Sequence, residues 1–148
     1  MNTLKNQITD VLKNSMRAKE MATVTVIRGL QAAIKQIEID ERIELDDAQV
    51  LAVIEKQIKQ RKESIKAFSG AGRDDLASKE QAELEVLSQF LPEAMTEEEL
   101  DSMIAQTIAA QEATSMKDMG KVMNSLRPLI AGRADPSQVS AKIKAKLA

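Results

Sequence analysis

Aliphatic side chains recur three and four positions apart through most of the chain, and this spacing constrains the fold more than any other feature. Residues spaced in this way share one face of an α-helix. Seven segments follow the pattern, starting near residues 4, 19, 46, 74, 97, 115 and 136. Because Phe68 and Phe90 are the only aromatic residues, the core must be aliphatic, and the many Lys, Glu and Gln residues also favour helix. The sequence predicts an all-α protein.

Helix-start and helix-stop signals divide the chain in two. Asp46 is suited to be an N-cap, and Gln49 three residues later would complete a capping box. A second capping box is expected at Thr96, directly after Pro92 interrupts the helical pattern. Asp135 followed by proline announces the last helix. We expect an amino-terminal bundle of about four helices over residues 1–92 and a three-helix subdomain over residues 93–148.

The residue types that are absent exclude several classes of function. The chain has no cysteine and no histidine, which excludes disulfides, thiol nucleophiles, Ser-His pairs and zinc sites of the usual kind. Carboxylates are plentiful, but no pair stands out as a general acid and base. We expect no catalytic residue, no metal site and no cofactor. The chain also lacks the apolar run of a signal peptide or a membrane span, so we expect a cytoplasmic protein.

Charge is segregated within the second half. Residues 93–112 hold six acids and no Lys or Arg, whereas residues 113–148 hold seven cations against two acids, a net of +5. No aromatic residue is interleaved for base stacking, so contacts to RNA would be to its backbone and shape. The alternative is an ordinary solvated surface. The candidate nucleic-acid-binding residues are Lys117, Lys121, Arg127, Arg133, Lys142, Lys144 and Lys146.

Four positions call for a structural interpretation. Gly120 is expected to permit close helix approach, and Gly132 to shape a turn. Gly29 lies inside a predicted helix, so a close backbone contact is expected there. Arg61 falls on an aliphatic line and calls for a carboxylate from the next helix, although a ligand-facing role stays open. Three nearby lysines share one face, which is typical of a solvated surface: Lys59, Lys62 and Lys66.

Several short segments, taken together and in order, resemble the YqeY-like family over essentially the full length. They are residues 27–30, 33–35, 38–40, 60–64, 71–77, 90–92, 116–123 and 132–135. The resemblance implies two helical subdomains. The second half is also similar to the tail domain of the B subunit of the glutamine-dependent aminoacyl-tRNA amidotransferase, which touches tRNA. The positions that match the tail are Gly120, Lys121, Met123, Gly132, Ala134, Asp135 and Pro136.

The resemblance implies a tRNA-binding-like module. The large catalytic portion of the amidotransferase B subunit has no counterpart in this chain. The first hypothesis is therefore a non-catalytic module that binds tRNA or another structured RNA. The second is a protein adaptor that docks a component of translation or replication. The third is an accessory to a glutamine-dependent carbon-nitrogen ligase, in which partners supply the chemistry.

Overall fold

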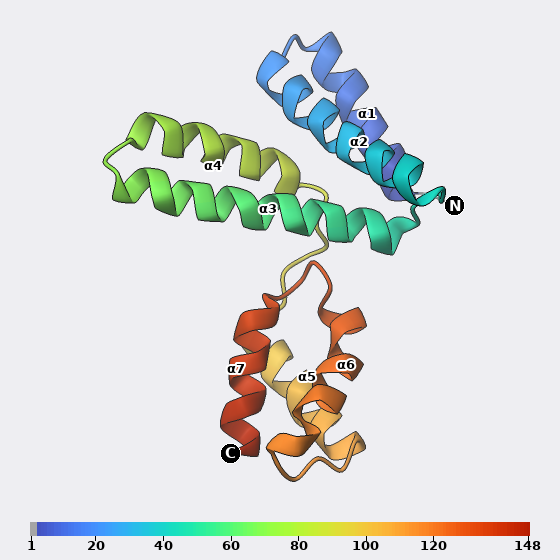
Figure 1. The fold of residues 1–148 in the computed structure, drawn as a ribbon, viewed down its shortest axis with the longest axis vertical. Helices are drawn as coiled ribbons and strands as arrows, with labels where there is room; N and C mark the ends of the chain where they lie inside the picture. Colours follow the sequence, from blue (N-terminus) through green and yellow to red (C-terminus); the bar gives the residue numbers. More distant parts are fainter. Residues whose placement is uncertain (1–2) are drawn as a thin grey trace. The chain divides into compact units, whose positions relative to one another are not determined.

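The computed structural model describes residues 3–148, and within that range it contains helices and no strand, which confirms the all-α prediction. Figure 1 shows the path of the chain. The helices are α1 (Thr3–Arg17), α2 (Met21–Glu41), α3 (Asp47–Gly70), α4 (Asp74–Ser88), α5 (Glu97–Ala110), the 3-10 turn η1 (Met116–Asp118), α6 (Met119–Ile130) and α7 (Pro136–Leu147). No helix in this range is long and apolar enough to cross a membrane.

The chain forms two compact units, Met1–Leu91 and Pro92–Ala148. Each unit has its own aliphatic core. In the first, α3 packs most extensively against α4, and α1 against α2. Its fully buried residues include Ile27, Leu30 and Ile54. These side chains are brought together because each helix places apolar residues on one face at three- and four-residue intervals.

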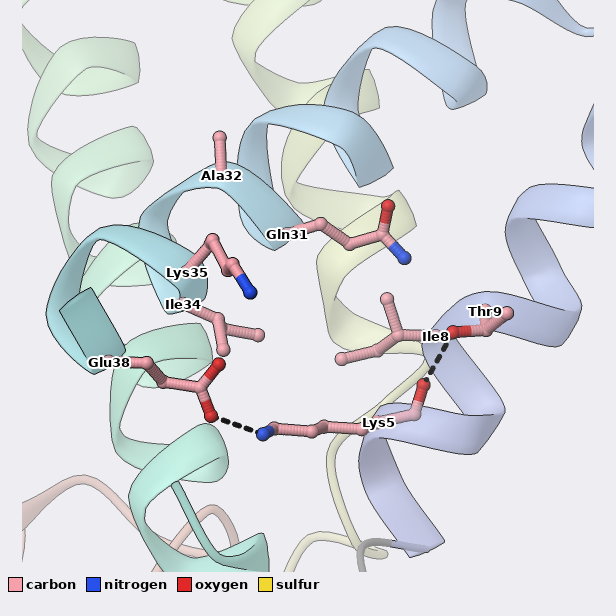
Figure 2. A pocket seen from close by; sticks show the side chains of 8 residues that line it. All are labelled: Lys5, Ile8, Thr9, Gln31, Ala32, Ile34, Lys35 and Glu38. Carbon is pink, nitrogen blue, oxygen red and sulfur yellow. Dashed lines mark hydrogen bonds and ion pairs between the residues drawn. The ribbon is translucent and has the colours of Figure 1, made fainter. Parts of the chain in front are cut away.

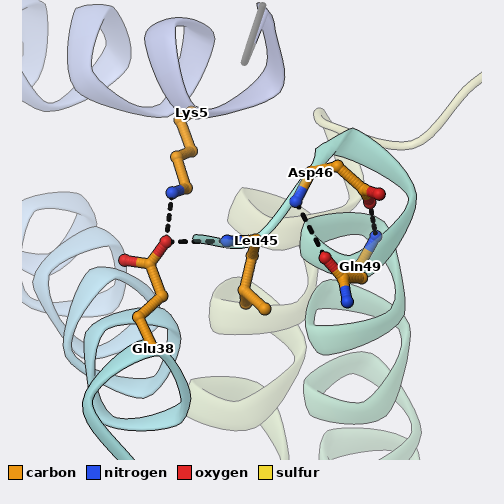
Figure 3. A network of polar contacts seen from close by, with 5 residues as sticks. All are labelled: Lys5, Glu38, Leu45, Asp46 and Gln49. Carbon is orange, nitrogen blue, oxygen red and sulfur yellow. Dashed lines mark hydrogen bonds and ion pairs between the residues drawn. The ribbon is translucent and has the colours of Figure 1, made fainter. Parts of the chain in front are cut away.

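A network of polar contacts fixes the corner between α2 and α3 (Figure 3). The Asp46 carboxylate accepts a hydrogen bond from the Gln49 main-chain N–H at 2.9 Å, and the Gln49 side chain accepts from the Asp46 N–H at 3.0 Å. The predicted capping box is therefore confirmed. Glu38 accepts from the Leu45 N–H at 2.9 Å and also from the Lys5 ammonium. The Leu45 side chain is 2% exposed. Glu38 thus joins α1, α2 and the start of α3.

A short turn that contains Gly72 connects α3 and α4. Helix α3 ends at Gly70, and Gly72 adopts a φ of 71°, which a residue with a side chain rarely adopts. Two expectations for this unit are wrong. A Cβ built on Gly29 would meet no heavy atom within 4 Å, so no close contact requires that glycine. Arg61 forms no ion pair within residues 3–148; instead its Nη1 donates to the Gln57 carbonyl at 3.4 Å, and its buried Nε has no partner.

The second unit is a three-helix arrangement with a core that includes Ile104, Leu126 and Ile143. Thr96 caps α5 by accepting from the Glu99 N–H at 3.1 Å, but the reciprocal half of the expected capping box is not formed. The Glu99 carboxylate instead lies 3.4 Å from the Arg133 guanidinium.

The other helix starts in the second unit also follow local sequence signals. Asp135 caps α7 as predicted, accepting from the Ser137 N–H at 2.9 Å. Helix α6 contains Pro128 and continues past it to Ile130.

Candidate nucleic-acid interface

The α6–α7 hairpin is basic because neither helix contains an acidic residue. The two nearby aspartates, Asp118 and Asp135, lie at helix starts. The Asp118 carboxylate accepts from the Thr114 N–H at 3.0 Å, and this hydrogen bond lowers the pKa of Asp118. The charge of Lys121, three residues further on, also contributes to lowering the pKa of Asp118, whereas Asp135 is the N-cap of α7.

Arg133 lies in the turn between α6 and α7, where it binds groups of its own unit. Its Nε donates to the Glu93 carbonyl at 2.9 Å, and its Nη2 lies 3.4 Å from a carboxylate oxygen of Glu99. Its main-chain carbonyl accepts from the Met95 N–H at 3.0 Å. The guanidinium therefore holds the segment that leads into α5 against the turn that leads into α7.

Lys142 lies on the side of α7 that faces α5. Its ammonium donates to the Asp101 carboxylate at 2.8 Å. This contact lowers the pKa of Asp101 and raises that of Lys142. The charge of Lys146 also contributes to lowering the pKa of Asp101, which places Lys146 on the same side of the unit. Two of the seven candidate cations, Arg133 and Lys142, are thus paired with acids of α5.

The opposite side of α7 meets α6. Ser125 of α6 accepts a hydrogen bond from the Gln111 side chain at the end of α5, at 2.8 Å, so this flank of α6 faces α5. By helical geometry the opposite flank, which carries Gly120 and Arg127, faces α7. Lys144 lies about 160° around α7 from Lys142, and so on the side toward α6. We call the surface that α6 and α7 form away from α5 the α6–α7 face.

Two exposed cations belong to the α6–α7 face, Arg127 and Lys144, whereas Lys121 lies one turn before Ser125 and therefore on the flank of α6 toward α5. All three are exposed, and none has an ion pair within residues 3–148. Lys121 and Lys144 lie near the start of α6 and the end of α7, which run antiparallel, whereas Arg127 lies about 9 Å further along α6. The structure therefore places Arg127 and Lys144 on the surface away from α5, and it places Lys121 close enough to the Asp118 carboxylate that its charge helps to lower the pKa of that group.

The other candidates are distributed differently. Lys117 lies in η1, before α6, and Arg133 lies beyond the far end of that helix, so the seven cations do not gather around one end. Gly120 is exposed, and a Cβ there would meet no heavy atom within 4 Å, so the expected close helix approach at Gly120 is wrong. Gly132 adopts a φ of 72°, as expected of a turn glycine.

A pocket in the first unit was not anticipated from the sequence. It lies between α1 and α2, has a volume of about 400 Å³, and is drawn in Figure 2. Ile8 and Ile34 lie at its apolar side, and the Lys5–Glu38 ion pair spans one end. Glu38 has a lowered pKa, chiefly because of the hydrogen bond from Lys5 and secondly because of the Leu45 N–H. Lys5 and Glu38 are 33 residues apart, so no local signal could have revealed their pairing.

Across positions 3–148, no group of three or more His, Cys, Asp or Glu side chains is placed to hold a metal ion.

Comparison with known protein families identifies the family to which the chain belongs. The family model described as Yqey-like protein matches residues 5–147. The chain belongs to the YqeY-like family. The matched range includes both units of this YqeY-like protein and all seven candidate cations.

Several similar proteins are named "Altered inheritance of mitochondria protein 41, mitochondrial". That of Pyrenophora tritici-repentis is 36% identical over 136 residues, which cover 90% of this chain and 75% of the relative. That of Lachancea thermotolerans is 31% identical over 139 residues, covering 89% and 74%. That of Eremothecium gossypii is 43% identical over 91 residues, covering 59% and 50%. The names place those relatives in mitochondria, and a cytoplasmic location for this YqeY-like protein stays a prediction.

Proposed function

We propose that this YqeY-like protein is a non-catalytic module that binds tRNA or another structured RNA through the α6–α7 face. The supporting observation is that Arg127 and Lys144 lie exposed on this face and Lys121 lies exposed near the start of α6, on two helices that contain no acid. Phosphate groups are the partner that such a surface attracts, because lysine and arginine that neutralise phosphates release bound counterions.

The chemistry of the face favours contacts to the RNA backbone. No Trp or Tyr occurs in the chain, and neither phenylalanine lies in the second unit, so no base can stack on an aromatic ring there. Ammonium and guanidinium groups on a rigid helical scaffold bind phosphates without reading base edges. The expected selectivity is therefore for the shape of a folded RNA rather than for its sequence.

The remaining candidates have different roles in this proposal. Lys117 and Lys146 are exposed and can add phosphate contacts at the margins. Arg133 and Lys142 act first within the protein, because their charges are directed at Glu99 and Asp101. Removing either of these two should alter stability as well as binding. The cleanest test therefore leaves both in place.

The test measures binding of the full chain to a tRNA transcript by fluorescence anisotropy at several KCl concentrations. The logarithm of the association constant should fall linearly with the logarithm of the salt concentration. The variant K121A/R127A/K144A should reduce this slope by about two to three units, because each lost phosphate contact removes somewhat less than one unit. The matched control is K13A/R17A/K79A, which removes two lysines and one arginine that are exposed in the first unit.

Three results would count against the proposal. The full chain fails to bind the transcript at low salt, the triple variant keeps the parent slope, or the control lowers the slope as much as the triple variant does. Circular dichroism of each variant shows whether it is folded.

A protein adaptor is the second candidate, and one observation favours it. Leu129 is 51% exposed on α6, on the flank that faces α5 rather than α7. An apolar contact there would be insensitive to salt, unlike phosphate binding. In the third candidate, the protein accompanies a glutamine-dependent ligase. The purified chain, given ATP, glutamine and mischarged tRNA, is expected to form no amide, and amide formation would show that it has an active site of its own.

A further inference from the structure

Three lysines on α3 form an exposed row in the first unit. Lys59, Lys62 and Lys66 are three and four residues apart, so they share one face of the helix. All three are exposed, and none lies within 4 Å of a carboxylate in the described part of the chain. We call these residues the α3 lysine row.

The row is open because of the way α3 packs. The buried residues of α3, namely Val50, Ile54 and Ile58, all lie in its first half. Beyond them α4 runs alongside α3, as Figure 1 shows, and partly covers a line that includes Ile65 and Phe68. Helical geometry puts the lysine row more than 90° around the helix from that line, so the row faces away from α4.

The row is part of a local excess of positive charge. Residues 56–66 contain five cations and one acid, Glu63, so 5 − 1 gives a net of +4, although the whole chain has a net charge of −2. Like charges three and four residues apart disfavour a helix. Because none of the three lysines has an ion pair in the described part of the chain, their charge is available to an anionic group outside the unit.

We propose that the α3 lysine row is a second phosphate-binding surface, which contacts the backbone of the same structured RNA. This inference rests on the proposed function. Lys59 and Lys66 are separated by about 10.5 Å along the helix axis. One nucleic-acid strand advances about 3.4 Å per phosphate, so the row spans about three phosphates.

The neighbours of the row favour RNA over a membrane surface. The residues next to it on the exposed side of α3 are Glu63, Ser69 and Gly70, and none of them is a large apolar side chain. A helix that binds in a membrane interface needs an apolar face to insert beside its cations. The half-buried Ile65 and Phe68 lie toward α4 instead.

Two phosphate-binding surfaces in one chain bind one RNA more tightly than either does alone. Once one unit has bound, the covalent connection keeps the other at a high effective concentration near the same molecule. The RNA must be long enough to reach both surfaces. We therefore expect a tRNA-sized molecule to bind more tightly than a short RNA hairpin.

The experiment uses the full chain and the same tRNA transcript. The variant K59Q/K62Q/K66Q keeps side-chain length and helix preference while it removes three charges. We expect its salt-dependence slope to fall by about two to three units. The control K13Q/R17Q/K79Q should leave the slope nearly unchanged. An unchanged slope in the row variant, or an equal fall in the control, would overturn the inference.

The variants separate this inference from the proposed function. If only K59Q/K62Q/K66Q lowers the slope, the lysine row is supported and the α6–α7 face is not. If only K121A/R127A/K144A does, the row proposal fails and the proposed function stands. If the full chain does not bind the transcript, both fail. The inference would also be overturned if K59Q/K62Q/K66Q weakened binding to vesicles that contain phosphatidylserine but left binding to RNA unchanged.

Discussion

Arg133 and Glu93 are joined by a hydrogen bond of 2.9 Å from the Arg133 Nε to the Glu93 carbonyl, across 40 residues of sequence. The Arg133 main-chain carbonyl accepts in turn from the Met95 N–H. The start of the second unit is therefore tied to the turn before its last helix by both the side chain and the main chain of one residue. This arrangement closes a unit of only 57 residues, for which a small core supplies limited stability.

Replacing Arg133 with alanine should lower the free energy of unfolding of the second unit by about 1 to 2 kcal/mol. The substitution leaves the Glu93 carbonyl without its donor and removes the contact to Glu99. Urea denaturation followed by circular dichroism measures the change. The control is K144A, which removes an exposed cation of the same unit and should change stability by less than about 0.5 kcal/mol. Equal effects of the two substitutions on the free energy of unfolding would show that the contacts of Arg133 with Glu93 and Glu99 do not stabilise the second unit.

Two glycines of the first unit should respond to alanine with opposite signs. Gly29 lies inside α2 with open space around it, so G29A should stabilise by up to about 1 kcal/mol. Gly72 also has open space, but its φ is 71°, so G72A should destabilise by about 1 kcal/mol or more. Thermal melts of the two variants measure both effects. Stabilisation by G72A would show that the turn does not need its left-handed conformation.

The stability of the first unit should depend on pH through Glu38. Hydrogen bonds from Lys5 and from the Leu45 N–H lower the pKa of Glu38 below its ordinary value of 4.5. Because the folded-state pKa is the lower one, ionised Glu38 stabilises the protein above about pH 4.5, and this contribution is lost as the pH falls through the folded-state pKa. Urea titrations at pH 7 and pH 3 should show a large loss for the parent and a smaller one for E38Q. Equal losses would indicate that other carboxyl groups carry the dependence.

Truncation of a core residue should affect one unit at a time. Ile54 and Ile143 are both fully buried, each in the core of a different unit. I54A and I143A should each cost about 2 to 5 kcal/mol, because the lost side chain leaves a cavity. Amide hydrogen exchange should show lost protection within residues 3–91 for I54A and within residues 92–148 for I143A. Loss of protection throughout the chain in either variant would show that the units unfold together.

Local features were predictable from the sequence, whereas contacts between distant segments were not. The caps at Asp46 and Asp135 depend on residues within three positions, and both were confirmed. The pairing of Lys142 with Asp101 depends on which flank of α7 faces α5, and helical periodicity alone does not say this. Arg61 shows the same limit. Its position correctly indicated the inner line of α3, but the carboxylates of α4 do not reach it.

For the candidate site, the sequence predicted which charged residues are present but not where they lie. The count of seven cations against two acids comes directly from the sequence, but the division of the cations between two sides of α7 does not. That division follows from two contacts, Gln111 with Ser125 and Lys142 with Asp101, which set the rotation of α6 and α7 about their axes. The RNA-binding role of these residues stays a prediction.

Pro128 gives α6 a hydrogen-bond acceptor, which its one lysine and one arginine cannot supply. Proline has no main-chain N–H, so the carbonyl of Asn124, four residues earlier, lacks the donor that a regular helix would supply. Both residues are exposed, and Asn124 lies one turn along α6 from Lys121. A surface otherwise made of cationic donors thus includes an acceptor. The ribose 2′-hydroxyl can donate to it and deoxyribose cannot, which gives a chemical reason to expect RNA to outcompete DNA of the same shape.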